Sequence, residues 1–131
     1  MRTRILIADG DDYRLDLYRR FFTGCGFEVR AASEGLACLV ELRRFPPDAL
    51  VLDMHLPWGG GDGVLAHMRT DPRLRRTPIV IIHSLHGAEV ASFALEFPKI
   101  QFIKKPFRLH TLLEAISAAG EPSLECAVAS A

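Results

Sequence analysis

The sequence predicts one α/β domain in which helices cover both faces of a parallel β-sheet. Apolar runs alternate five times along the chain with amphipathic segments of helical period. The apolar runs contain few charged residues, which is typical of strands that are buried on both faces. Right-handed crossovers between such strands give a doubly wound, three-layer sandwich. A chain of 131 residues that is 49% hydrophobic is long enough for one such domain with a core.

Five strands are expected where the apolar runs occur. They are Arg4–Ala8, Phe27–Ala31, Ala49–Leu52, Ile79–Ile82 and Ile100–Lys104. Prolines mark two of the boundaries, because Pro46 and Pro47 precede the third run and Pro78 precedes the fourth. The spacing of strands and intervening helical segments predicts repeated βα units rather than hairpins.

Five helices are expected between and after these strands. They are Asp12–Thr23, Glu34–Arg43, Gly63–Arg69, Ala88–Glu96 and Leu109–Ala119. In the first helix Leu15, Tyr18 and Phe22 recur at helical spacing, and Gly24 follows as a stop signal. Residues 1–120 are therefore expected to form the domain. Residues 121–131 lack helical periodicity and are expected to be a tail or the start of a linker.

Composition excludes several functional classes. The 16 basic and 16 acidic residues cancel, which argues against a nucleic-acid surface built on bulk charge. No run of 18 apolar residues exists, so no membrane-spanning helix is expected. Cys25, Cys38 and Cys126 show no CxxC spacing and cannot all pair. This pattern favours reduced thiols in a cytoplasmic protein.

Charged residues stand at the ends of three expected strands. Asp53 follows the third run, Asp9 the first and Lys105 the fifth. Open parallel sheets bind ligands beyond the carboxyl ends of their strands, so these side chains are expected to converge. Two carboxylates and a lysine suit a divalent metal and a phosphoryl group. Taken singly, each acid could instead cap a turn or helix, and the lysine could be solvated.

Three motifs give the segment from Arg4 to about Ala119 a resemblance to the receiver domain of two-component response regulators. They are Ile5-Leu-Ile-Ala-Asp9, Leu50-Val-Leu-Asp53-Met-His-Leu-Pro57 with Asp62-Gly63 downstream, and Lys104-Lys105-Pro106-Phe107. They occur in receiver order and at receiver spacing. The resemblance implies a flavodoxin-like fold with strand order 2-1-3-4-5. It also implies a signalling domain, with at most self-catalysed phosphorylation and dephosphorylation, rather than an enzyme.

The resemblance assigns a role to each strand-end residue. Asp53 would accept a phosphoryl group from a histidine kinase or phosphotransfer protein, as a carboxylate nucleophile that forms an acyl phosphate. Mg²⁺ would contact Asp9, Asp53 and the backbone carbonyl of His55, and would offset the repulsion between two anions. Lys105 would pair with the phosphoryl oxygens. Pro106 is expected to follow a cis peptide bond that directs Lys105 inward.

Two residues depart from the receiver pattern at the site. Gly10 stands where receivers carry a second acid, so Mg²⁺ binding is expected to be weakened. Asp11 could compensate through a shifted loop, or it could cap the following helix. His83 stands where receivers carry Ser or Thr, and it would either donate a hydrogen bond to the phosphoryl group or fill space. Ser84 could supply the hydroxyl only with a local change of register.

Two aromatic residues also bear on the function. Trp58 begins a glycine-rich loop that is about two residues longer than usual in receivers, and it could contact a partner, act as a lid or pack locally. Phe102 matches the aromatic residue that reports phosphorylation in many receivers. It could change rotamer as a switch residue, together with Ser84 and Pro106, or serve only in the core.

These observations support a phosphorylated receiver as the main interpretation. It would signal through helix 88–96 and strand 100–104, and a homodimer could form on the face that helix 109–119 completes. The alternative is an atypical receiver that serves as a phosphorylation-independent protein-interaction module, which Gly10 and His83 favour. A small flavodoxin-like enzyme is a third interpretation, but no substrate-specific motif supports it. No contact with nucleic acid or membrane is expected of this domain.

Overall fold

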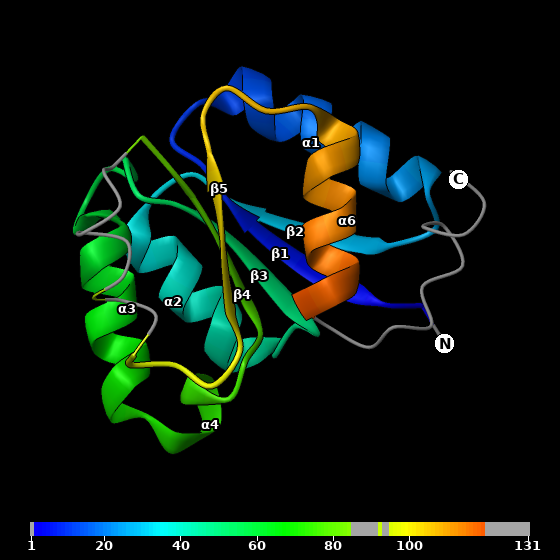
Figure 1. Cartoon of the computed structure of the whole chain (residues 1–131). Coiled ribbons are helices and arrows are strands. Elements are labelled where there is room, and N and C mark those ends of the chain that lie inside the picture. The colour runs from blue at the N-terminus through cyan, green and yellow to red at the C-terminus, as the bar shows by residue number, and fades with distance from the viewer. Residues whose placement is uncertain (1, 85–91, 93–94, 120–131) are drawn as a thin grey trace.

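A computed structural model describes residues 2–84, 92 and 95–119 of the chain. Its centre is a five-stranded parallel sheet in the order β2-β1-β3-β4-β5, which confirms the predicted fold class (Figure 1). The strands are β1 Arg4–Ala8, β2 Glu28–Ala32, β3 Ala49–Asp53, β4 Ile79–His83 and β5 Ile100–Lys104. Each strand lies within one residue of its predicted bounds. Asp53 and His83 are the last residues of their strands because Asp53 pairs with Ile82 and His83 with Lys104.

Helices cover both faces of the sheet (Figure 1). They are α1 Asp12–Gly24, α2 Gly35–Arg44, α3 Gly60–Thr70, the short α4 Pro72–Arg75 and α6 Leu109–Ala119. Helices α1 and α6 pack on one face, while α2, α3 and α4 pack on the other. Successive strand residues point to opposite faces, so Ile5 and Ile7 join the first core and Leu6 joins the second. Every residue of β3 and β4 is buried, as predicted for central strands.

Helix α3 and the loop before it differ from the prediction. The helix begins at Gly60, three residues before the predicted start at Gly63. Gly59 and Gly60 have φ angles of 100° and 66°, and Trp58 has 57°. Because glycine adopts positive φ without steric cost, the left-handed turn runs directly into the helix. The glycines that were expected to form a loop therefore form a helix start.

Other differences lie outside the site. Helix α4 was not predicted, although Asp71 followed by Pro72 is a helix-start signal, and the Asp71 carboxylate accepts a hydrogen bond from the Arg73 N–H. The expected helix Ala88–Glu96 lies largely, and the expected tail 121–131 entirely, outside the described residues. In the part of the chain that is described, no helix has the length and hydropathy needed to cross a membrane.

The loop between β3 and α3 is packed tightly against the start of α2. The Gly35 N–H donates to the Pro57 carbonyl at 2.9 Å. A Cβ atom on Gly35 would collide with the carbonyl oxygen of Trp58. Glycine at position 35 is therefore required by close backbone approach, and this contact holds the loop that follows Asp53.

We expect Gly35→Ala to lower the free energy of unfolding by about 1–3 kcal/mol, because the neighbouring backbone must move. Gly24→Ala is the matched control, since a Cβ atom there meets no other atom within 4 Å. The control should be neutral or stabilising by up to about 1 kcal/mol. Urea denaturation followed by circular dichroism measures both. Equal effects of the two substitutions would contradict the close approach.

Candidate phosphoacceptor site at the carboxyl edge of the sheet

Two buried carboxylates lie side by side at the carboxyl edge of the sheet. Asp9 directly follows β1 and is 0% exposed, while Asp53 ends the adjacent strand β3 and is 1% exposed. The Asp9 N–H donates to the Ala32 carbonyl at 3.1 Å, which fixes its backbone at the end of β1. Charged groups are costly to bury unless they are paired. The site therefore requires cations from the surrounding chain.

Lys105 provides one of these cations. Its Nζ lies 2.8 Å from Asp53 Oδ2, and its backbone N–H donates to the His83 carbonyl at 2.8 Å. The Lys105–Pro106 peptide bond is cis, as predicted. Lys105 and Asp53 are thus brought together from β5 and β3 as the sequence indicated.

The two oxygens of Asp53 have different surroundings. Oδ1 accepts a hydrogen bond from the His55 N–H at 2.8 Å. Oδ2 is buried and, among the described residues, has no donor in hydrogen-bond geometry; its contact with Lys105 is an ion pair by distance and charge, without hydrogen-bond alignment. Oδ2 is therefore a charged acceptor with unused lone-pair capacity. An oxygen in this state is suited to bind a cation or to attack an electrophile.

Arg14 provides the other cation, and sequence reasoning missed it. Its Nε donates to Asp9 Oδ2 at 3.0 Å, and its Nη2 donates to Asp9 Oδ1 at 3.0 Å. The same guanidinium lies 3.3 Å from a carboxylate oxygen of Asp11 and 3.9 Å from Asp53 Oδ2. The spacing of Asp11 and Arg14 on the first turn of α1 was the available signal, since residues three apart face each other.

Asp11 caps helix α1, which was one of its two predicted roles. Its Oδ1 accepts from the Tyr13 N–H at 2.8 Å and from the Arg14 N–H at 3.3 Å. Its own N–H donates to Asp9 Oδ1 at 2.9 Å. Asp11 therefore supports the backbone between Asp9 and the helix. The second carboxylate oxygen of Asp11, Oδ2, forms an ion pair with Arg14.

The pKa values of two side chains beside these carboxylates, Arg14 and Tyr18, are raised. The hydrogen bond to Asp9 raises the pKa of Arg14 above its ordinary value, against a smaller lowering by burial. Burial raises the pKa of Tyr18 to about 12, and the charge of Asp9 adds to the increase. With its pKa raised in this way, Tyr18, one helical turn beyond Arg14, is neutral at physiological pH.

Gly10 leaves no empty space where receivers carry their second acid. A Cβ atom at this position would lie 2.6 Å from Pro57 Cδ, which belongs to a rigid ring. It would also lie 3.5 Å from the His55 carbonyl oxygen, so this carbonyl faces the same region. An acid at position 10 consequently requires the loop that carries Pro57 to move.

The residues of the site fit a hard divalent cation in ligand type. Asp9, Asp53 and the His55 carbonyl present oxygen, and Asp53 Oδ2 has unused capacity. Over the described residues, no three His, Cys, Asp or Glu side chains are grouped so that they could hold a metal ion. Mg²⁺ prefers oxygen and usually keeps several waters, so few protein ligands suffice. Both Asp9 oxygens, however, are already engaged by Arg14.

The predicted switch residues lie at the end of β4 and beside it. His83 is buried, and its ring meets the ring of Phe102 edge-on at 6.0 Å between centroids. Ser84 Oγ lies 3.3 Å from Nε2 of His55, which connects β4 to the loop after Asp53. The structure thus brings Ser84 to the site through His55. The switch roles of Ser84, Phe102 and Pro106, and the role of His83 toward a phosphoryl group, stay predictions.

Trp58 does not pack into the interior. Its side chain is 78% exposed on the loop between β3 and α3. The local-packing interpretation was therefore wrong: at Trp58 the backbone is left-handed and its carbonyl packs against Gly35, while the ring is exposed. A partner contact and a lid remain as interpretations.

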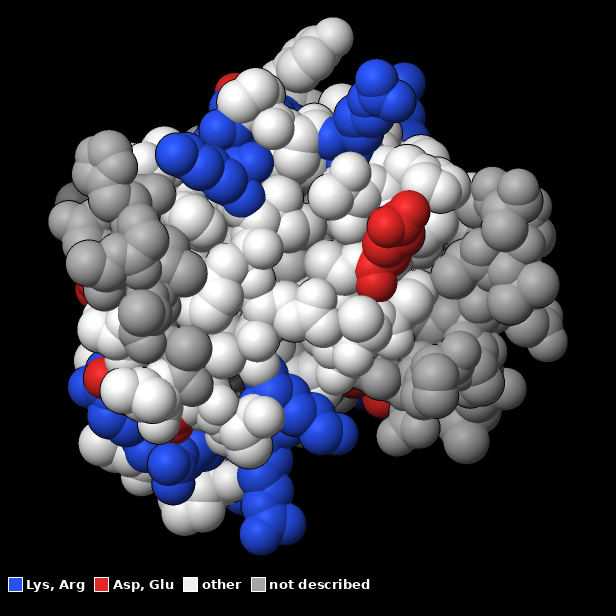
Figure 2. Space-filling model, viewed as in Figure 1, with Lys and Arg blue, Asp and Glu red and all other residues white. Residues whose placement is uncertain are grey.

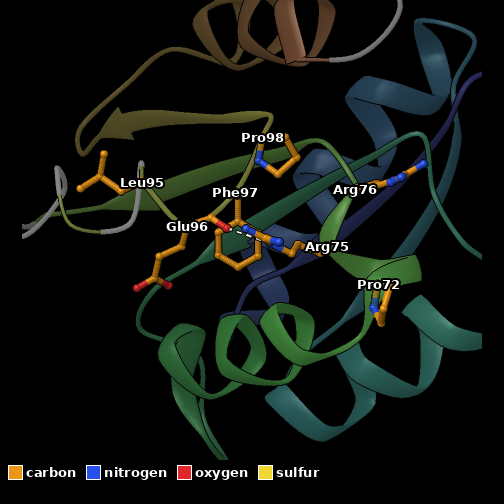
Figure 3. Close-up of a pocket in the computed structure, with 7 residues that line it drawn as sticks. All are labelled: Pro72, Arg75, Arg76, Leu95, Glu96, Phe97 and Pro98. Carbon is orange, nitrogen blue, oxygen red and sulfur yellow. Dashed lines mark hydrogen bonds between the residues drawn. The ribbon is translucent and has the colours of Figure 1, made fainter.

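A hollow lies at the opposite, amino edge of the sheet (Figure 3). Its volume is about 400 Å³, and it is lined among others by Arg75, Phe97 and Pro98. Arg75 Nε donates to the Glu96 carbonyl at 3.2 Å across its rim. Basic side chains gather at this lower end of the molecule (Figure 2). Because it lies at the amino ends of β4 and β5, this hollow is separate from the carboxylate site.

Fold and site together define a doubly wound α/β domain. At the carboxyl edge of its sheet, the buried carboxylates Asp9 and Asp53 form an acidic pocket, with Lys105 beside Asp53. The response regulator receiver domain family matches residues 5–117. The chain is 31% identical to the response regulator PleD of Caulobacter vibrioides over 106 residues, 81% of this chain and 23% of PleD. It is 29% identical to the DNA-binding response regulator MtrA of Mycobacterium tuberculosis over 118 residues, 90% of this chain and 50% of MtrA.

Solved structures show the same fold. Vibrio cholerae chemotaxis protein CheY4 superposes with a TM-score of 0.81 at 19% identity, covering 91% of this chain and 99% of that chain. The receiver domain of sensor histidine kinase PA1611 from Pseudomonas aeruginosa superposes with a TM-score of 0.78 at 18% identity. The superposition covers 91% of this chain and 98% of that chain. The chain therefore belongs to the response regulator receiver domain family. It spans about a quarter of PleD and half of MtrA.

We expect Gly10→Ala to lower the free energy of unfolding by about 1–3 kcal/mol, because the added Cβ atom overlaps the Pro57 ring. Gly10→Asp should lower it further, since it adds a like charge next to Asp9. Chemical denaturation measures both variants.

The control is a double-mutant cycle with Pro57→Ala, which removes the opposing ring. Gly10→Ala should cost less in that background, with a coupling of about 0.5–3 kcal/mol. Strictly additive effects would show that Pro57 does not limit the space at position 10.

Proposed function

We propose that this receiver domain accepts a phosphoryl group on Asp53 from a histidine kinase or a phosphotransfer protein. The observation that carries the proposal is the pair of Asp53 Oδ2 and Lys105 Nζ, 2.8 Å apart at the carboxyl edge. The oxygen is buried, charged and without an aligned hydrogen-bond donor in the described part of the chain. It is thus held as a nucleophile beside the cation that can receive the incoming phosphoryl oxygens.

The reaction is a displacement at phosphorus. Asp53 Oδ2 forms a bond to the phosphorus atom while the bond from phosphorus to the donor's histidine nitrogen breaks, and that nitrogen keeps the bonding electrons. The His55 N–H holds Oδ1, so the carboxylate rotamer is fixed before the attack. Lys105 passes from the carboxylate to the phosphoryl oxygens and stabilises their charge.

Mg²⁺ is the proposed metal cofactor. When bound, it would supply positive charge between the carboxylates and the phosphoryl group. Asp9, Asp53 and the His55 carbonyl would hold it. The PA1611 receiver domain has a magnesium ion coordinated in its active-site cleft, which supports the proposal by fold analogy. The glycine at position 10 removes one acid and is expected to weaken binding.

The signal would pass from Asp53 to the end of β4. Ser84 contacts His55, two residues after Asp53, and the neighbouring His83 contacts Phe102 on β5. A change at the carboxylate would thus reach β5 through these contacts. Signalling through helix 88–96, a homodimer on the adjoining face and a cytoplasmic location remain predictions.

We expect acetyl phosphate with Mg²⁺ to add one phosphoryl group to Asp53, because nucleophile and lysine are already paired. Intact-mass spectrometry should detect the adduct, and alkaline treatment should remove it as expected for an acyl phosphate. Asp53→Asn should abolish the adduct. The matched control Asp16→Asn removes a surface acid that pairs with Arg20, and it should leave the adduct intact.

No adduct at saturating donor and Mg²⁺ would reject Asp53 as phosphoacceptor. The interaction-module interpretation would then be the one that remains.

We further expect His83 to donate a hydrogen bond to the phosphoryl group. His83→Phe keeps a ring beside Phe102 and removes both nitrogens, so it should slow phosphorylation about tenfold. His83→Thr supplies the hydroxyl that receivers usually have, and it should stay within about threefold of the unaltered rate. Thermal denaturation of both variants serves as the folding control. A His83→Phe variant that reacts at the unaltered rate would show that the ring only packs.

A further inference from the structure

We propose that Arg14 is a built-in cation of the acidic pocket, and that a divalent ion binds only when the guanidinium leaves Asp9. The inference rests on the proposed cation site and adds its regulation. Arg14 would hold the resting site together without metal. It would also raise the metal concentration that is needed to occupy the site.

Arg14 engages both carboxylate oxygens of Asp9. Nε and Nη2 of Arg14 take one carboxylate oxygen each, at 3.0 Å in both cases. Oδ1 of Asp9 also accepts the Asp11 N–H at 2.9 Å. This bidentate geometry is the strongest form of arginine–carboxylate pairing. A metal ion that needs an Asp9 oxygen therefore competes with the guanidinium for it.

The balance of charge around Arg14 also opposes the binding of a divalent ion beside it. Arg14 faces three carboxylates, Asp9, Asp11 and Asp53, while Lys105 faces Asp53. Three negative and two positive charges leave a single uncompensated negative charge. A divalent ion added beside both cations would meet strong repulsion from Arg14. Without Arg14 the local charge is −2, which matches a divalent ion.

The Arg14 side chain has room to move away from Asp9. Its side chain is 44% exposed, whereas Asp9 is 0% exposed. Next to it lies an open hollow of about 340 Å³ between α1 and the segment after β5, lined among others by Leu17, Tyr18 and Phe107. The guanidinium can rotate toward this space while the backbone of α1 stays in place. Departure thus requires only rotation of the side chain.

An ordinary surface ion pair would not have these properties. Arg20 pairs with Asp16 on the same helix at 3.0 Å, but both side chains are more than half exposed. Such pairs contribute little and are screened by solvent. Arg14 differs because its acceptor is completely buried. Arg20 therefore offers a matched control on the same helix.

The test is Mg²⁺ binding by isothermal titration calorimetry with Mg²⁺ alone and no phosphodonor. Arg14→Gln should bind Mg²⁺ about tenfold more tightly, which corresponds to about 1.4 kcal/mol. Arg20→Gln should bind as the unaltered protein does. Metal-free Arg14→Gln should also melt at a lower temperature than the unaltered protein, and saturating Mg²⁺ should restore most of the loss.

A second measurement needs no variant and decides the matter if Arg14→Gln fails to fold. In the unaltered protein, the Arg14 Nε–H proton should give a protected nuclear magnetic resonance signal in EDTA, because it is bonded to buried Asp9. Saturating Mg²⁺ should abolish that protection. A signal that stays protected with Mg²⁺ bound would overturn the proposal.

The remaining outcomes are also decisive. Equal Mg²⁺ affinity of Arg14→Gln and unaltered protein would overturn the role of Arg14 and leave the cation site standing. Absence of Mg²⁺ binding in both would overturn the cation site and this inference together. Neither result bears on whether Asp53 is the phosphoacceptor, which the mass measurement decides independently.

Discussion

The burial of two carboxylates at adjacent strand ends is the constraint on which the rest of the site depends. Asp9 and Asp53 are both removed from water, and each is matched by one long cationic side chain. Those cations come from opposite directions, Arg14 from α1 and Lys105 from the end of β5. The site is therefore assembled by tertiary structure, because neither pair lies within one secondary-structure element.

The loop after Asp53 transmits this constraint to the surrounding elements. Pro57 accepts a hydrogen bond from Gly35 at the start of α2, and His55 contacts Ser84 at the end of β4. His55 also donates its N–H to Asp53. A change of charge or volume at this carboxylate thus acts directly on a loop that is anchored to a helix and to a strand. This arrangement gives a physical route from Asp53 to the surface of the domain.

The fold and half of the site could be read from the sequence, because both depend on local patterns. Apolar runs located the strands to within a residue, and the charges at their ends located Asp9, Asp53 and Lys105. Arg14 was not predicted as a site residue, because its contact with Asp9 depends on where α1 starts relative to β1. The missing acid at Gly10 could be read from the sequence, but the Pro57 ring that occupies the space beside it could not. Contacts between loops distant in sequence leave no local pattern to read.

The absence of an acid at Gly10 and the presence of Arg14 in the same site both reduce its net negative charge. A second acid at position 10 would add negative charge and strengthen the demand for a divalent ion. With glycine there, the remaining carboxylates are nearly balanced by Arg14 and Lys105 alone. The pocket can then stay folded and closed in the absence of metal, since no large repulsion between acids remains. On the proposed role of Arg14, such a site would exchange tight metal binding for a stable resting state, and metal entry would become a competition with the protein's own cation.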